Sequence, residues 1–266
     1  MFPYQSILFR FVSFILSIAP VVSNAASQKQ ETPIGIQQLL KAYPNFLESA
    51  TANTLYWKDG TEMIYDDGVK NKDLQTLLNS PDLEDQMSMP YFAGRNYQIP
   101  FKYFDSGRVR YEPFFLKMYG KSASQVKRRL VFISWMPKTV NKRLLVTSVN
   151  GVNEKFQAVS NELDDLPFHL KKYVSKTTGT FNWRKISGTN RLSGHSFGIA
   201  IDINIKYADY WRWNMPKNPR QELKYRNRIP IEIVEIFEKY GFIWGGKWYH
   251  YDTMHFEYRP ELLINH

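Results

Sequence analysis

Cysteine is absent from the 266 residues of this chain, and histidine occurs only five times. Without cysteine there is no disulfide framework and no thiolate that could bind a metal. A zinc site in this chain must therefore use histidine and carboxylate ligands, which is typical of catalytic sites rather than of structural, cysteine-rich ones. The same absence frees the chain from oxidative folding steps.

Long apolar runs are also missing, except near the amino terminus. There, Arg10 is the only charged residue among the first 25, residues 11–22 are mostly apolar, and Ser23-Asn24-Ala25 has small residues at its ends. These are the three parts of a secretory signal. The apolar run is shorter than the roughly 20 residues that span a bilayer. We predict a signal peptide over residues 1–25 that is cleaved after Ala25, and no stable membrane insertion afterwards. An uncleaved anchor is the alternative.

Acidic residues are outnumbered, because 35 Lys and Arg stand against 25 Asp and Glu, for a formal net charge of +10. A basic protein accumulates near anionic polymers, and the bacterial envelope is rich in them. Nucleic acid is the first partner that such a charge suggests. The export signal argues against it, and the basic residues are scattered in short runs. We expect an exported monomer in the periplasm or the extracellular cell envelope that binds no nucleic acid.

Helical and strand patterns are mixed without a regular alternation, which predicts an α+β fold. Apolar residues at helical spacing predict helices over residues 36–47, 153–166 and 230–240. Asn153 is expected to cap the second of these helices, and Pro230 to take the first position of the third.

Segments rich in branched and aromatic residues predict strands over residues 129–135 and 144–149. Residues 55–65 predict a hairpin that turns at Asp59-Gly60. No internal repeat or low-complexity linker is present. We expect the mature chain to consist of an N-terminal extension with a helix and a hairpin, residues 26–104, and a main domain, residues 105–266.

Two segments near the carboxyl end concentrate residues that can bind a metal. The first reads Ser-Gly-His-Ser-Phe-Gly-Ile-Ala-Ile-Asp over residues 193–202, and the second reads Asp-Thr-Met-His-Phe-Glu over residues 252–257. A catalytic zinc site typically takes three ligands from His and Asp or Glu, and leaves a fourth position for water. His195, Asp202 and His255 form such a set.

The first segment continues as a pattern of period two. Over residues 198–205 the odd positions are all Ile and the even positions are small or polar. A strand with this pattern buries the isoleucines and points Asp202 to the opposite face. Gly198 and Ala200 would share that face and leave room there for a ligand.

The second segment supplies a carboxylate that is not a ligand. Asp252 is placed to take the proton of the attacking water. On a straight strand, residues three apart face opposite ways, so we predict a bend at Thr253-Met254 with residues 255–257 as a strand. His255 and Glu257 would then share a face. Glu257 is either a partner for a His255 ring N–H or a surface carboxylate.

The string Ser-x-His-x-x-Gly-x-Ala-x-Asp followed by Asp-x-x-His resembles the signature of zinc D-alanyl-D-alanine carboxypeptidases of the VanY type and of the related L-alanyl-D-glutamate endopeptidases, in peptidase clan MD. The resemblance makes His195, Asp202 and His255 the ligands of one zinc ion and Asp252 the general base. It covers about residues 105–264. It implies a hedgehog/DD-peptidase-like fold, with a central antiparallel sheet flanked by helices.

Members of this family also place an arginine before the first histidine to hold the substrate carbonyl or the developing oxyanion. Arg184, eleven residues before His195, matches that position best, and Arg191 competes with it. His250 is an alternative ligand or substrate contact, although its tyrosine neighbours favour an ordinary packed histidine.

The resemblance implies hydrolysis of an amide bond in peptidoglycan stem peptides by metal-activated water. The residues alone do not separate a carboxypeptidase from an endopeptidase. A non-catalytic zinc-containing module that binds the cell wall is the alternative, and a basic adhesion protein is a third class. A serine nucleophile is not favoured, although residues 194–198 match Gly-x-Ser-x-Gly, because the resemblance implies metal-activated water as the nucleophile. Residues 207–228 are expected to form a loop between the two metal-binding segments that acts as a lid or as a specificity element.

Overall fold

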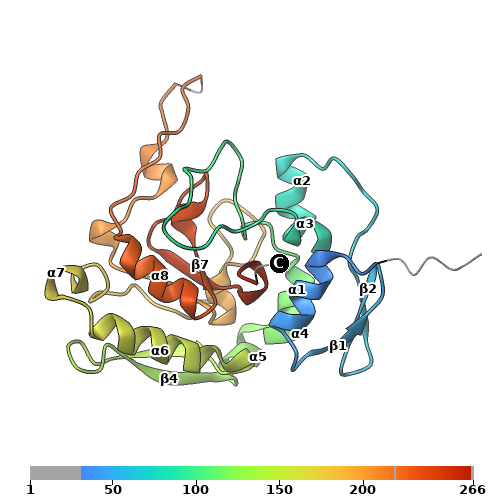
Figure 1. The fold of residues 1–266 in the computed structure, drawn as a ribbon, viewed down its shortest axis with the longest axis horizontal. Helices are drawn as coiled ribbons and strands as arrows, with labels where there is room; N and C mark the ends of the chain where they lie inside the picture. Colours follow the sequence, from blue (N-terminus) through green and yellow to red (C-terminus); the bar gives the residue numbers. More distant parts are fainter. Residues whose placement is uncertain (1–30, 219, 265–266) are drawn as a thin grey trace, which may run out of the picture. The chain divides into compact units, whose positions relative to one another are not determined.

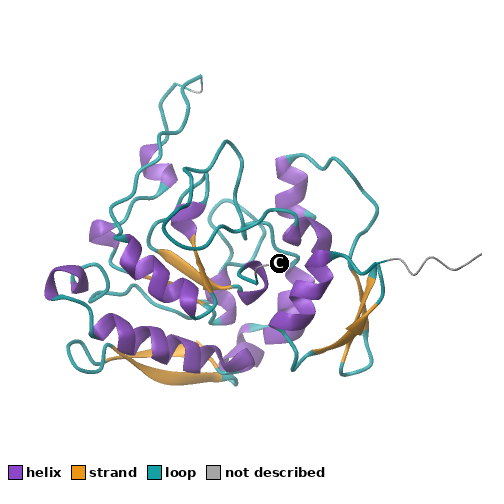
Figure 2. Cartoon of the chain, viewed as in Figure 1, coloured by secondary structure: helices purple, strands orange, loops and turns teal. Residues whose placement is uncertain are grey.

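The computed structural model describes residues 31–218 and 220–264, and residues 32–264 lie in one compact unit (Figure 1). The signal peptide predicted for residues 1–25 lies outside the described residues. Among the described residues, no helix combines the length and the apolar character that a membrane span requires. Helices and small antiparallel sheets are mixed along the chain, which confirms the α+β class (Figure 2).

The helices are α1 (Ile34–Ala42), α2 (Leu74–Asn79), α3 (Leu83–Met87), α4 (Glu112–Tyr119), α5 (Ala123–Lys127), α6 (Val152–Asp164), α7 (Phe168–Lys171) and α8 (Ile231–Lys239). The strands are β1 (Leu47–Ala50), β2 (Thr54–Trp57), β3 (Glu62–Ile64), β4 (Leu130–Trp135), β5 (Lys142–Thr147), β6 (Ala200–Asp202), β7 (Phe242–Trp244) and β8 (His255–Tyr258). They pair as three separate sheets, in the orders β1-β2-β3, β4-β5 and β6-β8-β7.

The hairpin predicted over residues 55–65 is confirmed, and so are the strands predicted over residues 129–135 and 144–149, although the second of these begins and ends two residues earlier. β2 and β3 pair antiparallel around Gly60, whose φ of +79° suits the turn. β4 and β5 pair over their whole length, and α6 covers them. The first helix is shorter than predicted: α1 ends at Ala42, and β1 begins at Leu47 and pairs with β2.

Asn153 does not cap α6, contrary to the prediction. Asn150 and Gly151 both adopt a left-handed backbone, with φ of +58° and +65°, and Gly151 takes the cap position. The helix therefore begins at Val152 and already includes Asn153. Pro230 likewise lies one position outside α8, as its cap residue.

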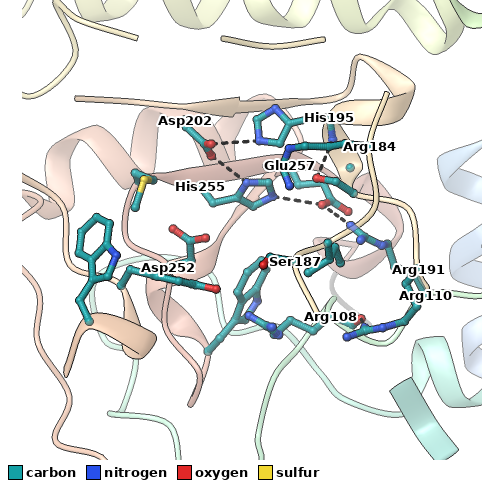
Figure 3. Close-up of a pocket in the computed structure, with 17 residues that line it drawn as sticks. Arg108, Arg110, Arg184, Ser187, Arg191, His195, Asp202, Asp252, His255 and Glu257 are labelled. Carbon is teal, nitrogen blue, oxygen red and sulfur yellow. Dashed lines mark hydrogen bonds and ion pairs between the residues drawn. The ribbon is translucent and has the colours of Figure 1, made fainter. Parts of the chain in front are cut away.

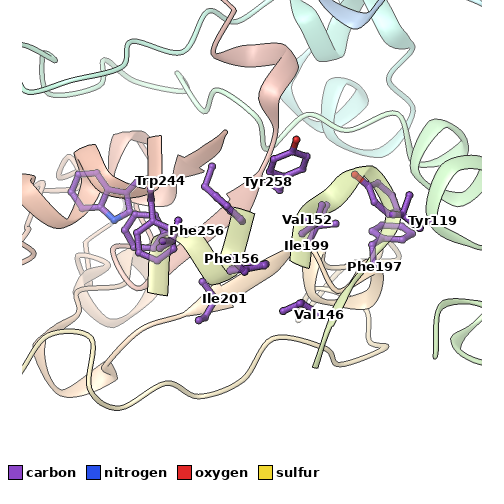
Figure 4. Close-up of a cluster of buried hydrophobic side chains, with 14 of the residues drawn as sticks. Tyr119, Val146, Val152, Phe156, Phe197, Ile199, Ile201, Trp244, Phe256 and Tyr258 are labelled. Carbon is purple, nitrogen blue, oxygen red and sulfur yellow. The ribbon is translucent and has the colours of Figure 1, made fainter. Parts of the chain in front are cut away.

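Aromatic side chains join the sheet β6-β8-β7 to α8 and α6, and Figure 4 shows Phe156, Trp244 and Phe256 in this buried cluster. Phe237 of α8 stacks on Phe256 of β8 with ring centroids 3.8 Å apart. Phe156 of α6 meets Phe242 of β7 at 4.4 Å. Phe242, Trp244, Phe256 and Tyr258 share one face of the sheet. Burial of these aromatic side chains stabilises the strands, which are too short to be stable alone.

The strand predicted over residues 198–205 is only partly present. Ile199, Ile201 and Ile203 are fully buried as predicted, but β6 covers only Ala200–Asp202, and Ile205 is exposed. Gly198 does not leave room beside Asp202. It ends a 3₁₀ turn with φ of +69°, and a Cβ there would lie 2.8 Å from Leu130 and 3.1 Å from the Thr147 amide nitrogen. Its hydrogen atoms therefore face the β4-β5 hairpin.

The segment before residue 105 packs on the rest of the unit. Ile36, Leu39 and Tyr43 of the α1 region belong to the same buried cluster as the core of the central sheet. The Tyr43 hydroxyl donates to Glu261 Oε2 at 2.6 Å, and Glu261 also pairs with the buried Arg259 at 2.5 Å. A separate extension over residues 26–104 stays a prediction, while these contacts join its described part to the main body.

Replacing Tyr43 by Phe tests this junction. The substitution removes a donor from the buried Glu261 carboxylate, so the free energy of unfolding should fall by about 1–3 kcal/mol in urea denaturation. Tyr56→Phe is the matched control, because the Tyr56 hydroxyl on β2 bonds to none of the described residues. Equal stability of the two variants would contradict the role of the Tyr43 contact.

Candidate metal centre

The pairing of β6 with β8 brings two of the predicted ligands together. Asp202, the last residue of β6, lies directly opposite His255, the first residue of β8. His195 lies on the 3₁₀ turn Gly194–Phe197 that precedes β6. Ligand atoms of the three residues lie within 4.8 Å of one another, and Figure 3 shows the Asp202 carboxylate beside both imidazole rings. Asp202 and His255 thus meet in one cluster although they lie 53 positions apart in the sequence.

Hydrogen bonds select the ring nitrogen that each histidine offers. His195 Nδ1 lies 2.9 Å from the Thr180 carbonyl, so this nitrogen must donate, and Nε2 is left as an acceptor. His255 Nε2 lies 3.2 Å from Glu257 Oε2, and Nδ1 lies 3.0 Å from Asp202 Oδ1. The contact between His255 and Glu257 was one of the two predicted alternatives. Outer partners of this kind orient the rings of metal-binding histidines.

These donor atoms fit a divalent metal such as zinc. His195 Nε2 is buried without a hydrogen-bond partner and lies 3.2 Å from Asp202 Oδ2. Burial raises the pKa of Asp202, but the charges and hydrogen bonds of the two histidines hold it well below its ordinary value. Burial lowers the pKa of His255, but Asp202 and Glu257 raise it to about 10. The cluster therefore favours a bound cation, and two nitrogens with one carboxylate are ligands that zinc prefers.

Asp252 lies in the turn before β8, as predicted. Its carbonyl accepts a hydrogen bond from the His255 amide at 3.1 Å, and residues 253–254 form the bend. Its carboxylate points into the cavity of the metal centre, and Oδ1 is buried without a hydrogen-bond partner (Figure 3). Burial, and then the negative charge of Asp202, raise the pKa of Asp252 to about 6. A carboxyl group with such a pKa can accept and return a proton near neutral pH.

The cavity around these residues combines four arginines with the three carboxylates of Asp202, Asp252 and Glu257. It measures about 310 Å³, and four arginines, Arg108, Arg110, Arg184 and Arg191, line it together with Tyr210, Trp213 and Trp248. Both predicted candidates for the oxyanion, Arg184 and Arg191, are therefore present. The sequence indicated neither Arg108 nor Arg110, because they lie more than 80 residues before His195 and belong to no local pattern.

The remaining candidates have other positions. His250 is outside the group of possible metal ligands, since its Nδ1 pairs with the buried Asp105 at 2.6 Å and its ring meets Trp211 edge to face. Ser193 lies at the cavity and its hydroxyl accepts a long hydrogen bond, 3.4 Å, from the His195 amide. Trp244, which lies close to the second motif in the sequence, is fully buried in the core.

Residues 187–258 match the model of a protein family described as D-alanyl-D-alanine carboxypeptidase. The matched segment contains the three predicted ligands and Asp252, and it confirms the family resemblance. It begins three residues after Arg184 and includes Arg191. No curated protein and no solved structure matches the chain.

Replacing His255 by Ala should abolish metal binding. Protein equilibrated with zinc and then dialysed should hold about one equivalent in the wild type, as expected of a site with three protein ligands, and almost none in the variant. Bound metal is measured by mass spectrometry of the ion. His169→Ala is the matched control, because His169 is exposed on α7. Zinc retained by His255→Ala would contradict the assignment.

Proposed function

We propose that this protein is a zinc-dependent metallopeptidase that hydrolyses an amide bond in peptidoglycan stem peptides. One observation carries the proposal: the donor atoms of His195, Asp202 and His255 converge in a cavity that is also lined by Asp252, whose Oδ1 is buried without a partner. These four residues lie inside the segment that matches the carboxypeptidase family. We further propose the hedgehog/DD-peptidase-like fold for residues 105–264.

His195, Asp202 and His255 would hold the zinc ion, which when bound polarises the scissile carbonyl and makes water more acidic. Asp252 is the general base in this proposal. It accepts a proton from the attacking water and returns it to the leaving amine. Its pKa of about 6 suits both transfers, because the carboxylate is ionised at neutral pH and its acid form is a competent donor.

Arg184 is proposed to stabilise the negative charge that develops on the carbonyl oxygen. Its guanidinium makes no hydrogen bond or ion pair with other described residues, and it lines the cavity. Arg110 is less suited to this role, because it forms an ion pair with Glu257 at 2.6 Å. A cationic donor placed at the oxyanion is among the largest contributions to amide hydrolysis.

A non-catalytic zinc module is not favoured. Burying a carboxylate without a partner costs free energy, and Asp252 Oδ1 is such a group. A structural metal site would not require this unpaired carboxylate oxygen.

We propose that the enzyme acts as an exported monomer in the periplasm or the extracellular envelope, where its substrate is present, and that it binds no nucleic acid.

Replacing Asp252 by Asn tests the general base. The amide keeps the shape of the side chain but accepts no proton, so kcat/KM for muropeptides should fall by about 10²–10⁴-fold. Zinc content should stay that of the wild type, because Asp252 is not a ligand. Asp165→Asn is the matched control, since Asp165 is exposed and pairs only with the exposed Lys138.

Mass spectrometry of the released peptides identifies the bond that is cut. Loss of one terminal alanine indicates a carboxypeptidase, and cleavage within the stem indicates an endopeptidase. Zinc-loaded wild-type protein that releases no peptide would contradict the proposed function.

Replacing Arg184 by Ala should lower kcat by about 10²–10³-fold, the usual effect of losing one oxyanion donor. Arg191→Ala should lower kcat much less, because Arg184 and not Arg191 is proposed to hold the oxyanion. Steady-state kinetics on a defined muropeptide separate the two effects. A larger loss of kcat in the Arg191 variant would exchange the two roles.

A further inference from the structure

A second cavity lies next to the metal centre. It is an open groove of about 800 Å³, and it shares two lining residues, Arg110 and Arg191, with the cavity of the metal centre. One wall consists of residues 75 and 78–81, from α2 and the turn after it. The other walls consist of residues 110–113 and 188–191. Three segments far apart in the sequence thus build the groove.

A small hairpin over residues 185–192 separates the two cavities. Lys185 bridges to Leu192, and the Ile186 amide donates to the Arg191 carbonyl at 2.8 Å. Gly188 lies at its tip with φ of +76°. Ile186 and Ser187 line the metal centre, whereas residues 188–190 line the groove. Arg191 belongs to both sides.

Hydrogen bonds to the start of α4 hold the base of this hairpin. The Leu192 amide donates to Glu112 Oε2 at 2.7 Å, and Arg110 Nη2 donates to the Leu192 carbonyl at 2.9 Å. Across the groove, Asp73 caps α2 by accepting from the Thr76 amide at 2.8 Å. The groove is therefore bounded by hydrogen-bonded elements on both sides.

The junction of the two cavities carries a positive charge without a matching carboxylate. Arg110 is paired with Glu257. Arg191 forms no ion pair with any described carboxylate, its Nε is buried without a partner, and its only side-chain hydrogen bond runs to the Arg108 carbonyl at 3.4 Å. Burial, and then the charges of Arg110 and Arg108, lower the pKa of Arg191 to about 10. A half-buried guanidinium without an ion-pair partner gains from a carboxylate ligand.

We propose that the groove is a subsite for an extended, acidic peptide, in which a carboxylate of the substrate pairs with Arg191 while the chain continues past the hairpin toward α2. The inference rests on the proposed function and deepens it, because it identifies the substrate as a peptide that extends well beyond the scissile bond. It also assigns a role to residues 75–81, which lie outside the segment that matches the peptidase family. The groove is large enough for several residues.

Filling the groove tests its use. Asn79→Trp places a large side chain in the groove, and Thr76→Trp places the same side chain on an exposed part of α2 that does not line it. We compare kcat/KM for a long muropeptide and for a dipeptide with the same scissile bond. The ratio of kcat/KM for the long muropeptide to kcat/KM for the dipeptide should fall about tenfold or more in Asn79→Trp, because contacts in the groove are lost. In Thr76→Trp this ratio should stay at the wild-type value. An unchanged ratio in the Asn79 variant would overturn the subsite.

The charge is tested with substrates in which one carboxylate is converted to an amide. One arm alters the C-terminal carboxylate and another alters a side-chain carboxylate. For the wild type, one of the two conversions should raise KM about tenfold or more, the size of a charged hydrogen bond. Arg191→Gln should lose that discrimination, and Arg191→Lys should recover part of it. A wild-type enzyme that is indifferent to both conversions would contradict a carboxylate at Arg191.

Binding to the zinc-loaded Asp252→Asn variant separates this inference from the proposed function. Isothermal titration with the long peptide measures affinity without turnover. Binding that Asn79→Trp weakens, together with an absence of hydrolysis by the wild type, would refute the peptidase and retain the subsite. Hydrolysis with binding that neither Asn79→Trp nor Arg191→Gln alters would refute the subsite and retain the peptidase.

Discussion

The metal centre depends on one buried carboxylate, that of Glu257. Its side chain is almost inaccessible, and it meets His255 at 3.2 Å, Arg110 at 2.6 Å and Arg259 at 3.4 Å. Burial raises its pKa, but these cations hold it well below the ordinary value. A buried charge is tolerated only when such partners are all in place. Orientation of the His255 ring, retention of Arg110 at the cavity and packing of the C-terminal strand therefore depend on the same group.

This constraint also explains the glycine in the Ser-Gly-His segment. A side chain at Gly194 would collide with the Glu257 carboxylate. Only glycine allows the turn that carries His195 to approach β8 this closely. Beyond Glu257, Arg259 continues the network to Glu261, and Glu261 accepts from Tyr43. The site is thereby connected through buried charges to the first helix of the described chain.

The surroundings shift the pKa values of two carboxylates in the cavity in opposite directions. Asp202 stays ionised because two imidazoles contact it. The pKa of Asp252 is raised to about 6 by burial and by the nearby charge of Asp202, and its Oδ1 has no hydrogen-bond partner among the described residues. Pairs of acidic groups whose environments separate their pKa values commonly divide ligand and proton-transfer roles. The arginines add a surrounding positive field, which favours acidic substrates and extends to the groove beside α2.

The sequence by itself determined the features that depend on neighbours along the chain. Period-two isoleucines predicted burial around β6, and the three-residue spacing of Asp252 and His255 required the bend that is present. It did not reveal that Gly198 faces the β4-β5 hairpin, that Asn150 and Gly151 delay the start of α6, or that Arg108 and Arg110 enter the cavity. Those outcomes depend on which distant surfaces pack together. Only the tertiary structure decided them, because periodicity records which side of an element is buried and not which part of the chain buries it.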